Sequence, residues 1–242
     1  MSALIDGLQP LEILMAALGT LLFIVLLPLF VRQVWANRPY NSLLAFFMLP
    51  VVMVGWPSIQ KIKFDKDSIE LEKATAALKA NPRDTALRTQ VETQVKQLET
   101  RPASSPRVLA DIGEAWLELG QQAASEAAVD KGLQTNPDAT GLKDLKGRIE
   151  TYKRVKELTS AVERNPTDTA TKVQLQDVAK RAAAIPTADP QVVNDLATAQ
   201  LVTGNAVDAA KLNNRALEIA PSSPGAIQLR ERILRAPASS KQ

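Results

Sequence analysis

The side chains that could carry out acid–base or metal chemistry in this chain are carboxylates, because its 242 residues include no histidine and no cysteine. Without these residue types, thiolate nucleophiles, disulfides, the usual zinc ligands and the commonest general base are excluded. Two close carboxylate pairs remain, Asp65 with Asp67 and Glu70 with Glu72. Each pair lies in a highly charged stretch, where the strongly shifted pKa of a catalytic carboxylate is not expected.

Enzyme motifs do not accompany these carboxylates. The sequence has no G-x-x-x-x-G-K-[ST] loop, no G-x-G-x-x-G after a strand and no G-x-S-x-G elbow. Its formal net charge is +3, from 29 Lys and Arg against 26 Asp and Glu, without the clustered basic excess typical of nucleic-acid binding. The sequence therefore predicts a protein that is not an enzyme, with no catalytic residues, no metal site, no cofactor and no nucleic-acid partner.

Two apolar segments near the N-terminus are long enough to enter a membrane. Residues 13–31 are 19 consecutive uncharged residues, close to the roughly 20 that cross a bilayer as a helix. A second uncharged run, residues 39–60, contains Pro50, Gly55 and Pro57, which membrane helices tolerate. Residues 1–60 are therefore predicted to be a membrane anchor, a hairpin of two transmembrane helices.

Each segment has an alternative. The first could be a signal peptide, but residues 1–10 contain no Lys or Arg, include Asp6, and precede an apolar stretch longer than a signal peptide needs. The second could be re-entrant or interfacial, since it is short and twice interrupted by proline.

Positive charges beside the two segments decide the predicted orientation. Lys and Arg are enriched on the cytoplasmic side of membrane proteins. The loop between the segments carries Arg32 and Arg38, whereas Lys61, Lys63, Lys66 and Lys73 follow the second segment. The count favours a cytoplasmic domain, although the flanks of the first helix alone indicate the reverse. We expect an integral protein of a bacterial inner membrane with its large domain in the cytoplasm.

Residues 61–72 connect the anchor to the rest of the chain. Lys61-Ile62-Lys63-Phe64 and Ser68-Ile69-Glu70-Leu71-Glu72 alternate apolar with polar residues around Asp65-Lys66-Asp67. This alternation predicts a juxtamembrane linker or small β-hairpin. The alternative is that Ser68 begins the first soluble helix.

The remaining sequence consists of two copies of one unit, which follow each other at a constant offset without a gap. Residues that begin and end helices recur at that offset: Pro82, Pro102, Pro106, Gly120 and Pro137 return as Pro166, Pro186, Pro190, Gly204 and Pro221. In the first copy they delimit helices over residues 68–80, 84–100, 106–119 and 121–135. A long helix over 140–164 and a capping helix over 224–235 complete the prediction. Because one such unit cannot bury its own apolar face, the copies are expected to stack.

The third and fourth helices of each unit resemble the tetratricopeptide repeat, a pair of antiparallel helices of about 34 residues. The matching residues are Leu109, Ile112, Gly113, Trp116, Gly120, Leu133 and Pro137, then Val193, Leu196, Ala197, Gly204, Ala209, Ala216, Leu217 and Pro221. Ser125 and Gly132 replace the family's preferred alanines, and Gln200 replaces the aromatic residue that Trp116 supplies. The resemblance implies an all-α fold, with residues 73–235 as a tetratricopeptide-like α-solenoid of two 84-residue units. Residues 236–242 are predicted to be a disordered tail.

In this family the first helix of each pair lines a groove that holds ligand peptides. Carried over position by position, the resemblance implies a protein-binding groove formed by Arg107, Ala110, Glu114, Leu117, Gln191, Asn194, Thr198 and Leu201. The lysine and asparagines with which some members clamp a chaperone's C-terminal carboxylate are not found at Ala110, Glu114 and Thr198. The alternative for these polar residues is an ordinary solvated helix face. Trp116 is expected to pack between helices.

The main functional hypothesis is a membrane-anchored scaffold or adaptor that binds partner proteins and organises a membrane-associated complex. The alternative makes the hairpin the working part of a transporter or channel, with the repeats as an accessory or regulatory portion. Neither span carries an ionisable residue at mid-membrane, the usual mark of an ion path. Self-association through the exposed end of the stack is a third alternative.

Overall fold

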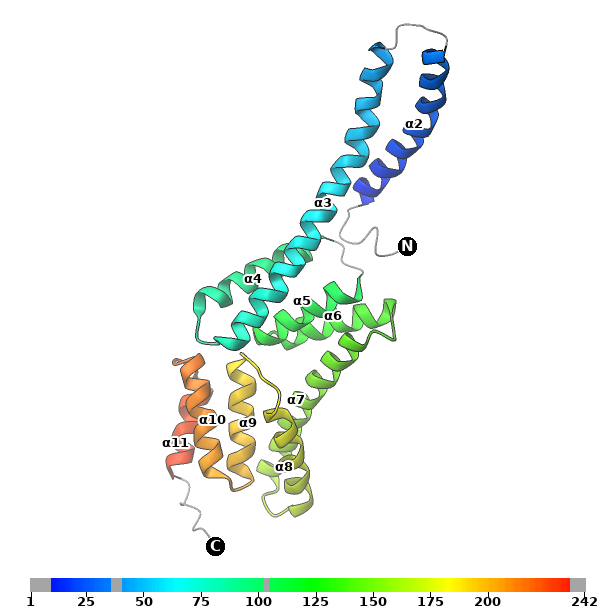
Figure 1. Cartoon of the computed structure of the whole chain (residues 1–242). Helices are drawn as coiled ribbons and strands as arrows, with labels where there is room; N and C mark the ends of the chain where they lie inside the picture. The colour runs from blue at the N-terminus through cyan, green and yellow to red at the C-terminus, as the bar shows by residue number, and fades with distance from the viewer. Residues whose placement is uncertain (1–9, 36–40, 102–104, 236–242) are drawn as a thin grey trace. The chain divides into compact units, whose positions relative to one another are not determined.

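The computed structural model of the chain describes residues 10–35, 41–101 and 105–235, and every regular element in those ranges is an α-helix (Figure 1). The all-α prediction is confirmed. The helices are α2 (Pro10–Trp35), α3 (Asn41–Ala80), α4 (Thr85–Glu99), α5 (Pro106–Glu118), α6 (Gln122–Thr135), α7 (Thr140–Arg164), α8 (Thr169–Ala183), α9 (Pro190–Val202), α10 (Ala206–Ile219) and α11 (Pro224–Arg235).

The chain divides into two compact units. The first comprises Met1–Glu70 with Lys96–Ser105, and the second comprises Leu71–Val95 with Pro106–Gln242. Helices α3 and α4 each contribute residues to both units. The repeated helices α5 to α11 belong to the second unit.

One helix among the described residues, over Pro10–Arg32, is long and apolar enough to cross a membrane, and most of its large side chains are exposed. The finding concerns length and composition, which an N-terminal signal sequence shares. The predicted second span begins outside the described residues, at residues 39 and 40. From Asn41 onward its residues form the start of α3.

Helices α2 and α3 approach each other closely at Gly19. A Cβ added to this glycine would lie 2.8 Å from the Cβ of Met53 and 3.3 Å from the carbonyl oxygen of Pro50. Gly19 and Pro50 are both buried. A residue without a side chain therefore allows this contact, as small residues do between membrane helices.

Helix α3 corrects the prediction for residues 61–72. These residues are helical and form no β-hairpin, and no new helix begins at Ser68 because α3 is continuous from Asn41 to Ala80. The buried residues Phe64, Ser68, Leu71 and Leu78 follow one another at intervals of three, four or seven, the period of one helix face. The alternation that suggested a strand is only a few residues long, so the longer helical pattern decides the structure.

The repeat of the sequence is present in the helices themselves. Helices α4, α5, α6 and α7 begin at Thr85, Pro106, Gln122 and Thr140, and α8, α9, α10 and α11 begin at the equivalent residues of the second copy, Thr169, Pro190, Ala206 and Pro224. Burial repeats with the same offset. The buried residues Leu71, Ala74, Thr75 and Leu78 of α3 correspond to the buried residues Val155, Leu158, Thr159 and Val162 of α7.

Aspartates cap the starts of three helices, α4, α8 and α9. Asp84 accepts hydrogen bonds from two backbone N–H groups at the start of α4. Asp168 accepts from the N–H of Thr171 at 3.1 Å, and Asp189 accepts from the N–H of Gln191 at 2.8 Å. Each carboxylate satisfies a helix N–H group that has no partner within its own helix.

Two antiparallel helix pairs, α5 with α6 and α9 with α10, form the centres of the two copies (Figure 1). Their turns are made by Gly120 and Gly204, whose φ angles of +83° and +92° favour glycine. Trp116 is only 8 % exposed, as expected for a residue packed between helices. The predicted disordered tail, residues 236–242, lies outside the described residues.

Candidate functional site

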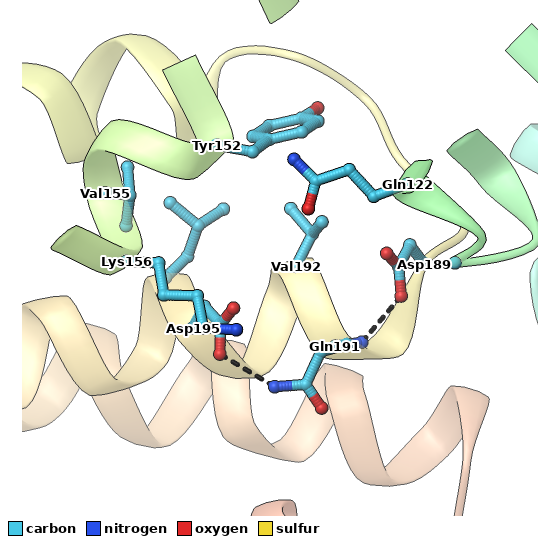
Figure 2. Close-up of a pocket in the computed structure, with 10 residues that line it drawn as sticks. Gln122, Tyr152, Val155, Lys156, Asp189, Gln191, Val192 and Asp195 are labelled. Atoms are coloured by element: carbon cyan, nitrogen blue, oxygen red, sulfur yellow. Dashed lines mark hydrogen bonds between the residues drawn. The ribbon is translucent and has the colours of Figure 1, made fainter. Parts of the chain in front are cut away.

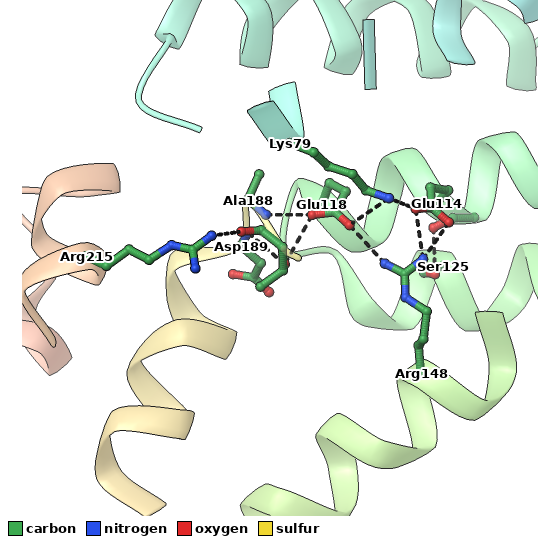
Figure 3. A network of polar contacts seen from close by, with 10 residues as sticks. Lys79, Glu114, Glu118, Ser125, Arg148, Ala188, Asp189 and Arg215 are labelled. Atoms are coloured by element: carbon green, nitrogen blue, oxygen red, sulfur yellow. Dashed lines mark hydrogen bonds and ion pairs between the residues drawn. The ribbon is translucent and has the colours of Figure 1, made fainter. Parts of the chain in front are cut away.

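A buried carboxylate at the end of α5 joins the two copies. Glu118 is 0 % exposed. Its Oε2 accepts hydrogen bonds from the backbone N–H of Ala188 at 2.6 Å and from Thr187 Oγ1 at 3.1 Å (Figure 3). These partners lie in the connection between α8 and α9. A side chain of the first copy therefore holds the segment that precedes the α9–α10 helix pair of the second copy. Residues 187–189 are called the clamped segment below.

Two arginines bind the carbonyl groups of the clamped segment. Arg88 of α4 donates through Nη2 to the Ala188 oxygen at 2.8 Å, and Arg215 of α10 donates to the Thr187 oxygen at 3.3 Å. The N–H of Asp189 donates to Thr187 Oγ1 at 3.1 Å. The segment is buried, and buried backbone groups require such partners.

Cations from α3 and α7 balance the charge of Glu118. Arg148 Nη2 donates to Glu118 Oε1 at 3.0 Å, while its Nη1 donates to both carboxylate oxygens of Glu114 at 2.8 Å. Lys79 pairs with Glu114, and its Nζ lies 3.6 Å from Glu118 Oε1 (Figure 3). Two cations thus face two carboxylates, which compensates the cost of burying them.

The pairing keeps Glu114 and Arg148 ionised. Burial alone would raise the pKa of Glu114, but the hydrogen bonds and charges of Arg148 and Lys79 outweigh burial and hold that pKa below its ordinary value. Burial alone would lower the pKa of Arg148, yet Glu114 and Glu118 raise it. A carboxylate with a lowered pKa is a weak proton acceptor near neutral pH. The network is therefore better suited to holding helices together than to transferring protons.

A cavity of about 200 Å³ lies beside the clamped segment (Figure 2). This volume is below the roughly 300–1,000 Å³ of most small-molecule sites. Its walls come from the turn before α6 and from α6, α7 and α9. The lining residues are Gly120, Gln122, Tyr152, Val155, Lys156, Asp189, Gln191, Val192, Asp195 and Leu196.

The acidic groups of this cavity have raised pKa values because they are buried. Burial raises the pKa of Asp189 to about 6 and that of Tyr152 to about 12. Burial also raises the pKa of Asp195, although a hydrogen bond from Gln191 opposes it. The charge of Asp189, which begins α9, thus changes near pH 6.

The predicted groove residues of α5 are partly covered by the chain itself. Leu117 is 1 % exposed, and Glu114 is held by Arg148 and Lys79. Ala110 is half-buried. Arg107 is exposed and pairs with Glu72 of α3 at 2.9 Å. On α5, Arg107 is therefore the predicted groove residue most accessible to a partner.

The predicted groove residues of α9 are arranged similarly. Asn194 is 7 % exposed, and its Nδ2 lies 3.4 Å from where a Cβ on Gly225 of α11 would stand. Thr198 and Leu201 are half-buried, and the Thr198 hydroxyl donates to the Asn194 carbonyl. Gln191 is exposed and donates to Asp195. Gln191 is the equivalent of Arg107 in the second copy, so the most accessible groove residue occupies the same place in both copies.

The polar residues that join the copies were not predicted from the sequence. Glu118 is the residue with a detectable signal, because its equivalent in the second copy is the apolar Val202. A charge that replaces an apolar residue on a repeated helix face indicates a specific buried partner. Lys79, Arg148 and Thr187 carry no comparable signal.

Comparison with protein-family models, with curated proteins and with solved structures found no match to this chain. Within the described ranges, no group of three or more carboxylates is arranged to hold a metal ion. The geometry of the chain itself therefore carries the functional interpretation.

Proposed function

We propose that this chain is a membrane-anchored, tetratricopeptide-like scaffold that binds partner proteins and organises a membrane-associated complex. The observation that carries the proposal is the repetition of helix starts and buried positions between the two copies. Stacked helical repeats offer extended surfaces that suit protein partners. The polar network around Glu118 supports the same function, since it ties one copy to the next and keeps such a surface in a fixed geometry.

The N-terminal segments support the anchoring part of the proposal. Helix α2 has the length and composition of a membrane span. The close contact of Gly19 with α3 supports a hairpin in which the start of α3 is the second span. The excess of lysines after that span favours a cytoplasmic repeat domain at a bacterial inner membrane.

Two equivalent exposed residues identify the surface to test first. Arg107 and Gln191 lie in the first turns of α5 and α9, and both side chains are exposed. The experiment places a photoreactive amino acid at each position in the full chain and crosslinks it in living cells. The matched controls are Thr89 of α4 and Val173 of α8, which are also exposed and also occupy equivalent positions of the two copies.

The expected result is one discrete foreign protein attached at both Arg107 and Gln191 and at neither control. The proposal would be rejected if all four positions captured the same mixture of proteins, or if none captured any. Extraction of the membranes with alkaline carbonate tests the anchor separately. A chain released into the supernatant would contradict the membrane part of the proposal and leave the binding part standing.

A further inference from the structure

An open groove of about 630 Å³ lies in the second copy, between α8, the end of α9 and α10. Its apolar lining residues are Ala183 and Leu212, and Gln200 of α9 also lines it. The other residues that line it are Gln176, Lys180, Asn205, Asp208 and Lys211. It is called the α8–α10 groove below.

The first copy holds a tryptophan at the equivalent position. Gln200 is the second-copy equivalent of Trp116, and both residues precede the same turn. The Trp116 carbonyl accepts a hydrogen bond from the N–H of Gln121 at 2.8 Å, and the Gln200 carbonyl accepts from the N–H of Asn205 at 2.8 Å. Because the backbones match, the two side chains leave equivalent points of the repeat. Trp116 is 8 % exposed, whereas Gln200 is half-buried beside an open groove.

The charges around the groove favour an acidic partner. Lys180 has no ion-pair partner among the described residues, and the Lys211 Nζ pairs with Asp208 at 3.2 Å. Lysine stems pack well against apolar surface while their ammonium groups remain in water. An ammonium group near an aromatic ring also attracts its π-face. The groove thus combines two apolar side chains, two lysines and a repeat position that is a tryptophan in the other copy.

The aromatic residues of the repeat part of this chain are already buried and cannot fill the groove. Beyond Phe64 the sequence contains only Trp116 and Tyr152, and both are buried. Residues 102–104 and 236–242 contain no aromatic residue. We propose that the α8–α10 groove receives a tryptophan or similarly large aromatic side chain, flanked by acidic residues, from a partner protein. This inference rests on the proposed scaffold function and specifies one contact of it.

Disulfide trapping tests the groove with a defined probe. The chain contains no cysteine, so Asp208→Cys provides a single thiol at the groove wall. The purified full-length variant in detergent is equilibrated with equal amounts of an indolylethyl disulfide and a propyl disulfide, and intact mass gives the ratio of the two adducts. If the groove binds an indole, the indole adduct should exceed the propyl adduct by about fivefold, because aromatic packing usually contributes about 1 kcal/mol.

Two controls distinguish binding of the indole in the groove from its non-specific binding elsewhere on the protein. Ala124→Cys places the thiol at the equivalent position of the first copy, which already has its own buried tryptophan, Trp116, so no indole preference is expected. Gln200→Trp in the Asp208→Cys background should fill the groove and return the adduct ratio to about one. Circular dichroism confirms that each variant remains folded. Equal adduct ratios at Asp208→Cys and Ala124→Cys would overturn the proposal.

A photoreactive amino acid at Asp208 in cells identifies the source of the aromatic side chain. The proposal expects an adduct that Gln200→Trp abolishes and whose attached peptide contains an aromatic residue beside Asp or Glu. A crosslinked dimer of this chain would instead assign the groove to a second copy and overturn the partner assignment. If Asp208→Cys selects no indole while Arg107 and Gln191 still capture a foreign protein, the groove assignment fails and the scaffold function stands.

Discussion

Replacing Glu118 with alanine is expected to release the clamped segment from the first copy. In the native chain Glu118 accepts hydrogen bonds from the Ala188 N–H, the Thr187 hydroxyl and Arg148. The substitution leaves a buried N–H without an acceptor and removes one of the two carboxylates that face Arg148. Breaking a buried pair usually costs about 3–5 kcal/mol. Because Arg148 keeps Glu114 at 2.8 Å, we expect the lower end, about 3 kcal/mol.

Hydrogen exchange measured by mass spectrometry reports this change directly. The Ala188 amide is itself a donor to Glu118, so a peptide covering residues 184–189 should lose protection in Glu118→Ala. A cost of about 3 kcal/mol corresponds to a roughly hundredfold faster opening. Glu118→Gln keeps an acceptor for the amide and loses only the charge, so a smaller loss of protection is expected.

Glu114→Ala is the matched control for Glu118→Ala. Glu114 shares Arg148 and Lys79 with Glu118, but no hydrogen bond joins it to the described residues of the clamped segment. Its removal should destabilise α5 against α7 while residues 184–189 keep their protection. If Glu118→Ala left exchange in that peptide unchanged, the carboxylate would not be what holds the segment. The hydrogen bonds from Arg88 and Arg215 and the burial of Ala188 would then account for its position.

Three further substitutions test other parts of the structure. The raised pKa of Asp189, about 6 against 3.8, means that the folded chain binds more protons between pH 4 and 6, so its stability falls as pH rises through that range. Asp189→Asn should abolish this fall and add at most about 3 kcal/mol at pH 7, as measured by urea unfolding at several pH values. Gly120→Ala should lower stability by more than the roughly 1–2 kcal/mol that a positive φ costs an alanine, because the added Cβ also lies 3.2 Å from Asp189 Oδ1. Gly204→Ala has open space around it, so it should lose only the energy of the positive φ. Equal losses of stability in thermal unfolding would refute this difference. Gly19→Ala should destabilise the α2–α3 contact by about 1–3 kcal/mol in detergent, whereas Gly55→Ala, which meets nothing within 4 Å and gains helix propensity, should not lower the unfolding temperature.

Helix boundaries were predictable because local residues determine them. Asp84, Asp168 and Asp189 provide acceptors to the N–H groups that follow them in sequence, and Gly120 and Gly204 adopt a backbone conformation that other residues avoid. These effects act over a few residues and repeat wherever the residues repeat. The helix boundaries after residue 80 were therefore predicted to within one or two residues.

The course of α3 was harder to predict because two local patterns compete there. The alternation at residues 61–64 and 68–72 indicates a strand, but the same segment contains Phe64, Ser68 and Leu71 on one helix face. The helical pattern continues to Leu78 and extends a helix that already began at Asn41. A pattern that spans several turns outweighs an alternation of four or five residues, since helix formation is cooperative.

The buried polar contacts were not predictable from local sequence because their partners are distant. Glu118 bonds to Arg148, 30 residues away, and to Ala188, 70 residues away. No helix propensity or cap specifies such a contact. Only comparison of the two copies, Glu118 against Val202, marks the position as unusual.

The differences between the copies indicate where partners should bind. In the first copy Trp116 is packed, and Glu114 and Glu118 are bound by Lys79 and Arg148. The equivalents of Trp116, Glu114 and Glu118 in the second copy are Gln200, Thr198 and Val202, and of these three Gln200 lines the open α8–α10 groove. In the proposed scaffold both copies present an exposed residue in the first turn of α5 or α9, and the second copy adds the open α8–α10 groove. Exchanging Trp116 and Gln200 should therefore move indole selection from Asp208→Cys to Ala124→Cys, and unchanged selection would show that the tryptophan does not determine which copy is open.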